Sequence, residues 1–513
     1  MISDNSPLFA QSEDVIDDGI SPENDYSEPP SYDSLNPLVG SRSGFETELD
    51  SDSVGGGSGV GGERDGSFDS VLDSDFCYGL VNRRPHGNEQ LASSRNESGT
   101  GIIYTTFLIV NAGLGAALLN FPKSYDEAGG LGIAIFVQAF LLIFILIALL
   151  VLAFSADHCG AKTLQDAMYG SAGKFGKYLS SVIVAIYTFG TTITFLIIIG
   201  DQIDRVFESW VGPGWSEIWY YNRTFTITMS SVLFILPMCF SKKIDFLSIP
   251  STLGVIAILY IVCLVIYEYY FGDYKHGKIK THPDSWMDVF LVVPVICFGY
   301  QCHVSVIPIY SCMKQRNIKN FTISSFSAIA ICCFCYTGAA GWGYYTFGSL
   351  VQPDILLMYD ASDPKILMAN IAMALKTITT YPILLFCGRE AIISVIFHSG
   401  GGTRLVSSII SLIWFVLSLL SALLIPDIDL VIKALGSLAS IFIFVFPGIC
   451  LFKYTLRVDP SFVRKKTIAI LLISIIFQVI GFFIFGVVLT QAVRNIKLTG
   501  LTGGQYIEGR EYL

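Results

Sequence analysis

The sequence predicts an all-α polytopic membrane protein of about eleven transmembrane helices, of which the first and the sixth are broken. Of the 513 residues, 52% are hydrophobic and only 14% are charged, which is too little charge for a soluble surface of this size. Eleven apolar runs approach the ~20 residues that a helix needs to cross the hydrocarbon core. Glycine, proline and polar residues interrupt the first and the sixth of these runs.

The eleven runs are candidate membrane spans. In lipid, backbone polar groups must be paired within a helix or a closed barrel, so runs of this length predict helices. The run at 224–240 is the weakest candidate, because it is short and rich in Thr and Ser. The predicted spans are 102–121, 131–154, 179–200, 224–240, 246–271, 286–310, 323–347, 365–388, 404–425, 429–452 and 467–490.

Residues 1–100 have a different composition from the rest of the chain. They hold 20 of the 42 Asp and Glu but only 5 of the 32 Lys and Arg, and they include long Gly/Ser-rich stretches. Such a segment cannot bury enough apolar area to offset the entropy of ordering it. We therefore expect a disordered acidic tail, whose charge carries no information about the substrate.

The charged loops predict the orientation of the chain. Loops on the side of the tail carry fifteen Lys and Arg, against seven in the opposite loops between spans. By the positive-inside rule the N-terminal tail is cytoplasmic, and residues 491–513 form a short lumenal or extracellular tail. Asn222, in the sequon "NRT", then lies on the non-cytoplasmic side and is a candidate glycosylation site.

Polar and glycine residues interrupt the first span within "NAGLGAALLNFP", residues 111–122. The sixth span, "DVFLVVPVICFGYQCHVSVIPIY", is interrupted by Pro294, Gly299 and Pro308 and carries Gln301 and His303 at its middle. The two broken spans are five apart, and an odd number of spans turns the second copy upside down. This pattern predicts inverted repeats over 101–271 and 286–452, an extra helix at 467–490, and a site between the breaks.

The breaks predict a site for a zwitterion. The N–H groups of a half-helix N-terminus can hold a carboxylate, and freed carbonyl groups can hold an ammonium group or Na⁺. We expect the amides of Gly113 to Gly115 to hold the carboxylate. A kink with closely packed small residues is the structural alternative. The candidate substrate-binding residues are Gly113, Leu114, Gly115, Phe298, Gly299 and Gln301, with the hydroxyls of Tyr300 and Thr188 as further candidates.

The motifs "NAGLGAALLNFP", "CFGYQCHVSVIPIY" and "TITTYPILLFCGRE" resemble the amino acid/auxin permease family. Within it they are most similar to the sodium-coupled neutral amino acid transporters, and there to the lysosomal glutamine-transporting branch. The resemblance covers residues 101–490 approximately. It implies a leucine-transporter-type fold in which spans 1–5 and 6–10 form a 5+5 inverted repeat and span 11 is added.

The resemblance also implies ion ligands. Asn111 occupies the position at which the family's Asn serves sodium coupling, and a Thr before Pro382 provides a hydroxyl for the same ion. Of Thr377, Thr379 and Thr380, we favour Thr380 and Thr377, which lie one turn apart, so that Na⁺ is expected at Asn111 and Thr380. Such hydroxyls also commonly bond to their own helix. Lys376 departs from a simple sodium site, because a fixed positive charge there disfavours Na⁺.

Two further ionisable groups lie within spans. His303 is a candidate proton handle, because imidazole titrates between cytosolic and acidic lumenal pH; a histidine hydrogen-bonded to a neighbouring backbone is the alternative. Lys433 lies near the predicted lumenal start of its span, where snorkelling to the interface explains it.

These features together predict a secondary active transporter of neutral polar amino acids, glutamine or asparagine, working by alternating access and coupled to Na⁺ or H⁺. The alternative is a nutrient sensor that binds amino acids and signals through the tail. A channel is a third class, against which the broken helices without a ring of like charges argue. No HExxH, GxSxG or Walker motif is present, so we expect no enzyme, no cofactor and no nucleic-acid partner.

Two overlapping motifs in the tail predict partners. "PPSY", with Pro29, Pro30 and Tyr32, has the form read by the WW domains of ubiquitin ligases. "YDSL", from Tyr32 to Leu35, has the form of an endosomal sorting signal read by adaptors. Together with the resemblance, these motifs favour a lysosomal or late endosomal membrane over the plasma membrane.

Overall fold

The structure is a computed structural model that describes residues 100–211, 223–240, 248–397, 403–425, 427–458 and 465–501. The predictions made for residues 1–99, which include the motifs at Pro29, Pro30, Tyr32 and Leu35, lie outside the described residues. The predicted glycosylation site at Asn222 lies outside them as well.

All named elements in these ranges are helices, which confirms the predicted all-α class. Nine of the described helical segments are long and apolar enough to cross a membrane, and two shorter apolar helical segments fall on the first and fourth predicted spans. The count of eleven crossings and the inverted repeat stay predictions. The long helices are α4 (Leu131–Cys159), α5 (Leu164–Val211), α8 (Ser248–Phe271), α11 (Ile318–Phe347), α12 (Pro364–Ile396), α13 (Arg404–Leu424) and α16 (Lys465–Leu501). The helix α5 is kinked at Gly173, whose φ of 67° and ψ of −157° are not helical.

Two other predicted spans contain a π-helical turn. The fourth predicted span consists of α6 (Arg223–Ser230), the π-helical turn η5 (Ser231–Ile235) and α7 (Leu236–Cys239). The tenth consists of α14 (Ile428–Ser440), the π-helical turn η10 (Ile441–Val445) and α15 (Phe446–Val458). Both segments therefore stay helical through their interruptions.

The first and sixth spans are broken, as predicted. The first consists of α2 (Ile102–Gly113), the 3₁₀ turn η2 (Ala116–Leu119) and α3 (Phe121–Glu127). The sixth consists of the 3₁₀ turn η7 (Asp288–Leu291), α9 (Val292–Gly299) and α10 (His303–Ser311). In both, the helical ladder stops near the middle of the apolar run.

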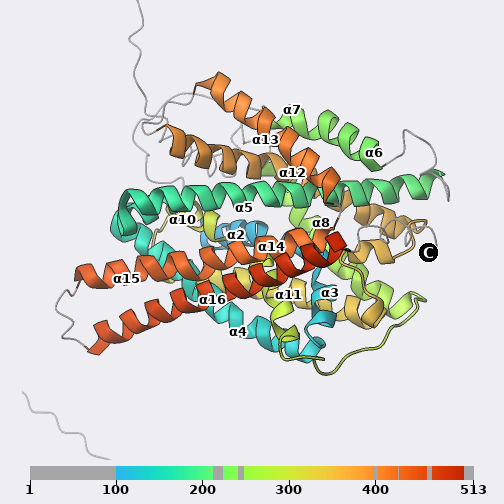
Figure 1. Cartoon of the computed structure of the whole chain (residues 1–513), viewed down its shortest axis with the longest axis horizontal. Helices are drawn as coiled ribbons and strands as arrows, with labels where there is room; N and C mark the ends of the chain where they lie inside the picture. Colours follow the sequence, from blue (N-terminus) through green and yellow to red (C-terminus); the bar gives the residue numbers. More distant parts are fainter. Residues whose placement is uncertain are drawn as a thin grey trace, which may run out of the picture. The chain divides into compact units, whose positions relative to one another are not determined.

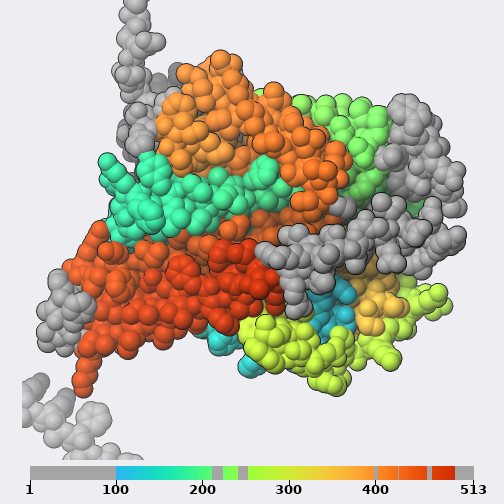
Figure 2. Space-filling view, in the orientation of Figure 1, coloured from blue at the N-terminus to red at the C-terminus, as the bar shows by residue number. Residues whose placement is uncertain are grey.

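The helices pack as a bundle around these broken spans (Figure 1). The long helix α5 packs along α12, α2 packs against α11, and α9 packs against α14. At the last of these contacts a Cβ added at Gly436 would overlap the carbonyl of Pro294, so glycine allows the two backbones to approach. Figure 2 shows α15 and α16 on one outer face. Leu472 and Ile476 of α16 are exposed, as expected of side chains that face lipid.

Candidate substrate site at the two helix breaks

The first break frees two consecutive carbonyl groups. The helix α2 ends at Gly113, and Leu114 turns out of it with φ −84° and ψ 109°. The backbone of Gly115 is extended, and a Cβ added there would meet nothing within 4 Å. The carbonyls of Gly113 and Leu114 therefore lie at the helix end without the partners that a continued helix would supply.

The second break lies against the first. The helix α9 ends at Gly299, and α10 begins at His303. A Cβ added at Gly299 would lie 2.8 Å from the ring of Phe121 and 3.2 Å from the Cβ of Ala117. The end of α9 thus packs on the second half of the first span, and the absence of a side chain at Gly299 permits this approach.

The hydroxyl of Tyr336, in α11, joins the two breaks. Its one hydrogen is shared between the carbonyl of Gly113 at 2.7 Å and that of Gly299 at 3.0 Å, and its oxygen accepts from the amide of Gly115 at 3.2 Å. Its ring stacks on Phe121, with centroids 4.3 Å apart and planes inclined by 16°. Tyr336 is not among the site residues predicted from the sequence. The available signal was a tyrosine in the middle of a span, since a buried hydroxyl needs a partner.

Lys376, in α12, reaches the other freed carbonyl. Its side chain is buried, and its Nζ donates to the carbonyl oxygen of Leu114 at 2.8 Å. The residue that made a simple sodium site doubtful in the sequence therefore points directly into the first break. The structure thus brings together Gly113, Leu114, Gly115 and Gly299 of the predicted set, with Tyr336 and Lys376 as their side-chain partners.

The predicted hydroxyl ligands are bonded within α12. Thr377 donates to the carbonyls of Met373 and Ala374, and Thr380 donates to that of Lys376 at 2.7 Å. Thr379 likewise donates to the carbonyls of Leu375 and Lys376. Each hydroxyl oxygen keeps acceptor capacity for a cation. Asn111 is half-buried near the end of α2. The ion-binding role of Asn111, Thr377 and Thr380 stays a prediction.

Gln301 and His303 interact with each other at the second break. The amide oxygen of Gln301 accepts from the backbone N–H of His303 at 2.8 Å and lies 3.0 Å from its Nδ1. His303 is fully buried, and no hydrogen bond of normal geometry joins its Nε2 to the described residues. Its ring nevertheless interacts with the backbone of Ile145 in α4, which agrees with the alternative of a histidine held by a backbone group. The amide nitrogen of Gln301 has no partner among the described residues. Both nitrogens are buried at the second break.

The remaining predicted contacts lie around the breaks. The hydroxyl of Tyr300 accepts from Gln138 at 2.9 Å, within a polar cluster that includes Tyr125 and Thr337. Phe298 is buried and lies 6.2 Å from Tyr187 between ring centroids. Thr188 bonds to its own helix α5. The hydroxyl of Tyr300 is therefore held by this polar cluster beside the breaks.

One end of the first span is held by buried charges. Lys433, in α14, pairs with Glu127 of α3 at 2.7 Å and with Asp429 at 2.6 Å. Asn120, at the start of α3, donates to Asp429 at 3.2 Å and to the carbonyl of Pro353 at 3.3 Å. The expectation that Lys433 snorkels to the interface is therefore wrong. Its side chain is only 5% exposed, because two carboxylates offset the cost of its burial.

The loop between α11 and α12 is attached at the same end. Asp354 in this loop accepts from the side chain of Gln202 at 2.8 Å and caps the 3₁₀ turn η9 (Ile355–Met358) through the amide of Leu356. Burial raises the pKa of Asp354 from 3.8 to about 7, and the negative charge of Asp201 adds to the shift. The loop therefore carries a carboxyl group that titrates within the physiological range.

The raised pKa of Asp354 predicts the pH dependence of stability. Between its ordinary pKa of 3.8 and about 7, the folded protein holds a proton that the unfolded chain has lost. The contribution is present at low pH and is lost as the pH rises through that window, by at most about 1.4 kcal/mol per pH unit. We expect Asp354→Asn to flatten the fall in melting temperature between about pH 4 and pH 7.

The control is Asp360→Asn in the same loop. Hydrogen bonds from Ser362 lower the pKa of the exposed Asp360, so its replacement should leave the fall in that window intact. Thermal unfolding of the purified protein across this pH range measures both variants. A wild-type slope in Asp354→Asn would show that another group titrates there.

The opposite end of the first span is held by backbone hydrogen bonds. The amide of Thr100 donates to the carbonyl of Cys312 at 2.9 Å, and the amide of Lys314 donates to the carbonyl of Thr100 at 3.0 Å. These bonds tie the start of α2 to the segment that follows α10. The two broken spans are thus linked at this end as well as at their breaks.

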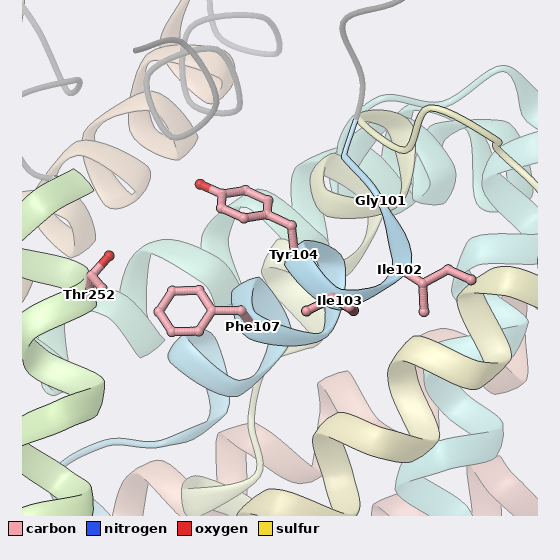
Figure 3. A pocket seen from close by; sticks show the side chains of 6 residues that line it. All are labelled: Gly101, Ile102, Ile103, Tyr104, Phe107 and Thr252. Carbon is pink, nitrogen blue, oxygen red and sulfur yellow. The ribbon is translucent and has the colours of Figure 1, made fainter.

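An apolar groove lies beside α2, away from the breaks (Figure 3). Its lining comes from the first turns of α2 and from Thr252 of α8, and Tyr104 and Phe107 project toward α8. Ile103 is largely exposed there. The described residues therefore leave one side of the first half of the broken span uncovered.

The fold and the site define a polytopic membrane protein with a polar centre between two broken helices. The family model of the transmembrane amino acid transporter protein matches residues 98–494, and the chain belongs to this family. Sodium-coupled neutral amino acid transporter 7 of Danio rerio is 38% identical over 78% of this chain and 89% of that protein. The human protein of that name is 38% identical over 77% and 88%.

Two more distant similarities were found. Human solute carrier family 38 member 8 is 31% identical over 74% of this chain and 91% of its own length. The crystal structure of MhsT in complex with L-phenylalanine shares 14% identity, covers 79% of this chain and 100% of its own, and has a TM-score of 0.47. The relatives that establish the family are transporters and not enzymes, in agreement with the sequence prediction.

Proposed function

We propose that this protein is a secondary active transporter that carries neutral polar amino acids, such as glutamine and asparagine, with Na⁺ or H⁺ as the coupling ion. The observation that carries the proposal is the meeting of two broken helices at the hydroxyl of Tyr336. Membership of the amino acid transporter family supports it, as do the sodium-coupled transporters among the relatives.

The freed backbone groups suit a zwitterion. A substrate carboxylate can take the amide of Gly115 in place of the tyrosine oxygen, since both are hydrogen-bond acceptors. A substrate ammonium can bind the carbonyls of Gly113 and Gly299, which face the same point. The unpaired amide nitrogen of Gln301 can donate to the carbonyl oxygen of a glutamine or asparagine side chain. His303 is the proposed proton handle.

Alternating access is proposed from the two ends of the first span. One end is held by the pairing of Thr100 with residues 312–314, and the other by Asn120 and Glu127. The breaks lie between these two sets of contacts, so releasing one set at a time would expose the site to one side at a time. The open groove beside α2 leaves room for that half to move.

Flux through proteoliposomes tests the proposal. Purified full-length protein should carry labelled glutamine with saturation, driven by a Na⁺ or pH gradient applied separately. Gly113→Leu should abolish this flux, because even a Cβ at that position lies 3.4 Å from the sulfur of Cys332 and the larger side chain would fill the break. Gly486→Leu is the control, since a Cβ there meets nothing within 4 Å. Normal flux in Gly113→Leu would refute the site.

Deletion of the N-terminal tail distinguishes the proposed transporter from the alternative of a nutrient sensor. We propose that the motifs at Pro29–Tyr32 and Tyr32–Leu35 engage a WW-domain ubiquitin ligase and sorting adaptors, and direct the protein to a lysosomal or late endosomal membrane. Deleting residues 1–95 should preserve flux in proteoliposomes and move the protein toward the cell surface. An amino acid signal that is lost with the tail, together with no flux by the intact protein, would favour the sensor.

A further inference from the structure

The side chain of Lys376 places a positive charge of the protein itself at the first helix break. The side chain leaves α12, and its Cγ passes Gly254 of α8, where an added Cβ would lie 3.2 Å away. Its Nζ ends 2.8 Å from the carbonyl oxygen of Leu114. A glycine in α8 thus leaves room for the lysine stem, and a backbone carbonyl freed by the helix break receives the ammonium group.

Among the residues that the structure describes, no acid lies close enough to this ammonium group to balance its charge. Among the described residues, the carbonyl of Leu114 is its one hydrogen-bond partner, and no carboxylate lies within ion-pair distance. Among the described titratable groups, the thiol of Cys332 in α11 is the one that interacts with it electrostatically. Burying such a charge within a membrane is costly, and charges that persist there mark functional sites. Packing alone therefore does not explain why the charged side chain of Lys376 is buried.

Lys376 binds a backbone carbonyl oxygen, which is the kind of ligand that Na⁺ also binds. In broken-helix transporters, carbonyls of the unwound segment coordinate the coupling cation. Thr380, predicted to hold Na⁺, lies one helical turn from Lys376 on the same face of α12, and the ammonium group of Lys376 reaches the break. A second cation between Thr380 and the break would face a fixed positive charge in a poorly screened environment.

We propose that the ammonium group of Lys376 is a tethered cation that replaces Na⁺ at the break of the first span. Transport, as proposed above, then needs no Na⁺ at the carbonyl of Leu114, because the ammonium group of Lys376 already occupies that ligand. The inference rests on the proposed transport function, and it places H⁺ ahead of Na⁺ as the coupling ion.

Two substitutions separate the charge of Lys376 from its volume. Lys376→Met keeps the stem packed beside Gly254 but leaves the Leu114 carbonyl without a cation. Lys376→Ala removes the stem and leaves space in which Na⁺ can reach that carbonyl. The full-length protein is measured in NaCl and in equimolar choline chloride, by the melting temperature of the purified protein and by glutamine flux in proteoliposomes.

We expect the wild type to show the same melting temperature and the same flux in both salts. Lys376→Ala should lose flux in choline and regain it in NaCl, with stimulation on the order of tenfold, as is typical of two coupled ligands. It should also gain a Na⁺-dependent rise in melting temperature. Lys376→Met should lose flux in both salts and gain no such rise.

A wild type that is stabilised by Na⁺ and loses its flux in choline would overturn the inference, whether or not the variants fold. If the wild type moves no glutamine under any gradient, the proposed function fails. In that case the melting temperatures still test the inference, because they report Na⁺ binding even when no flux is measured.

Discussion

Replacing Tyr336 by Phe should reduce amino acid flux by at least about tenfold, which corresponds to about 1.4 kcal/mol. The substitution keeps the ring that stacks on Phe121 but removes the hydroxyl that meets Gly113, Gly115 and Gly299. Each buried backbone group left unpaired costs about 1–3 kcal/mol. Because these groups belong to both breaks, the loss should disorder the geometry between them and also lower the melting temperature.

Tyr345→Phe in the same helix is the matched control. The side chain of Tyr345 is half-buried, and its hydroxyl makes no hydrogen bond with the described residues. Initial rates of glutamine flux, normalised to reconstituted protein, should therefore be unchanged in this variant. Equal rates in Tyr336→Phe and wild type would mean that the hydroxyl does not hold the breaks together during transport.

The second large effect is expected at Lys433. Lys433→Met should destabilise the folded protein by about 3–5 kcal/mol, because it removes the cation shared by two largely buried carboxylates. Glu127 and Asp429 retain side-chain exposures of only 20% and 15%, so water can replace the ammonium group only in part. Thermal unfolding of the purified protein measures the loss.

Two control variants are compared with Lys433→Met. Lys433→Arg keeps the positive charge and should retain most of the stability. Lys280→Met removes a lysine from an exposed pair with Asp284 and should have little effect, because water screens that pair. A melting temperature in Lys433→Met that matches Lys280→Met would show that the buried pair contributes nothing to holding α3 against α14.

The local features of this fold could be predicted from the sequence. Runs of apolar residues indicate spans wherever they occur, because the cost of burying polar groups in lipid depends on the segment itself. The breaks could be placed near Gly113 and Gly299 for the same reason, since glycine and polar residues weaken a helix at the point where they stand. The structure confirms both breaks.

The partners of the freed groups depend on the tertiary structure. Tyr336 follows Gly113 by 223 residues and Lys376 follows Leu114 by 262 residues, and no periodicity within a helix specifies such contacts. The same holds for Lys433, whose position near a span end suggested the interface, whereas Glu127, 306 residues away in the chain, keeps it buried. Helix packing decides which distant side chain meets a freed carbonyl or a buried carboxylate. The hydropathy of a span does not specify these partners, because many different sequences of similar hydropathy can cross a membrane equally well.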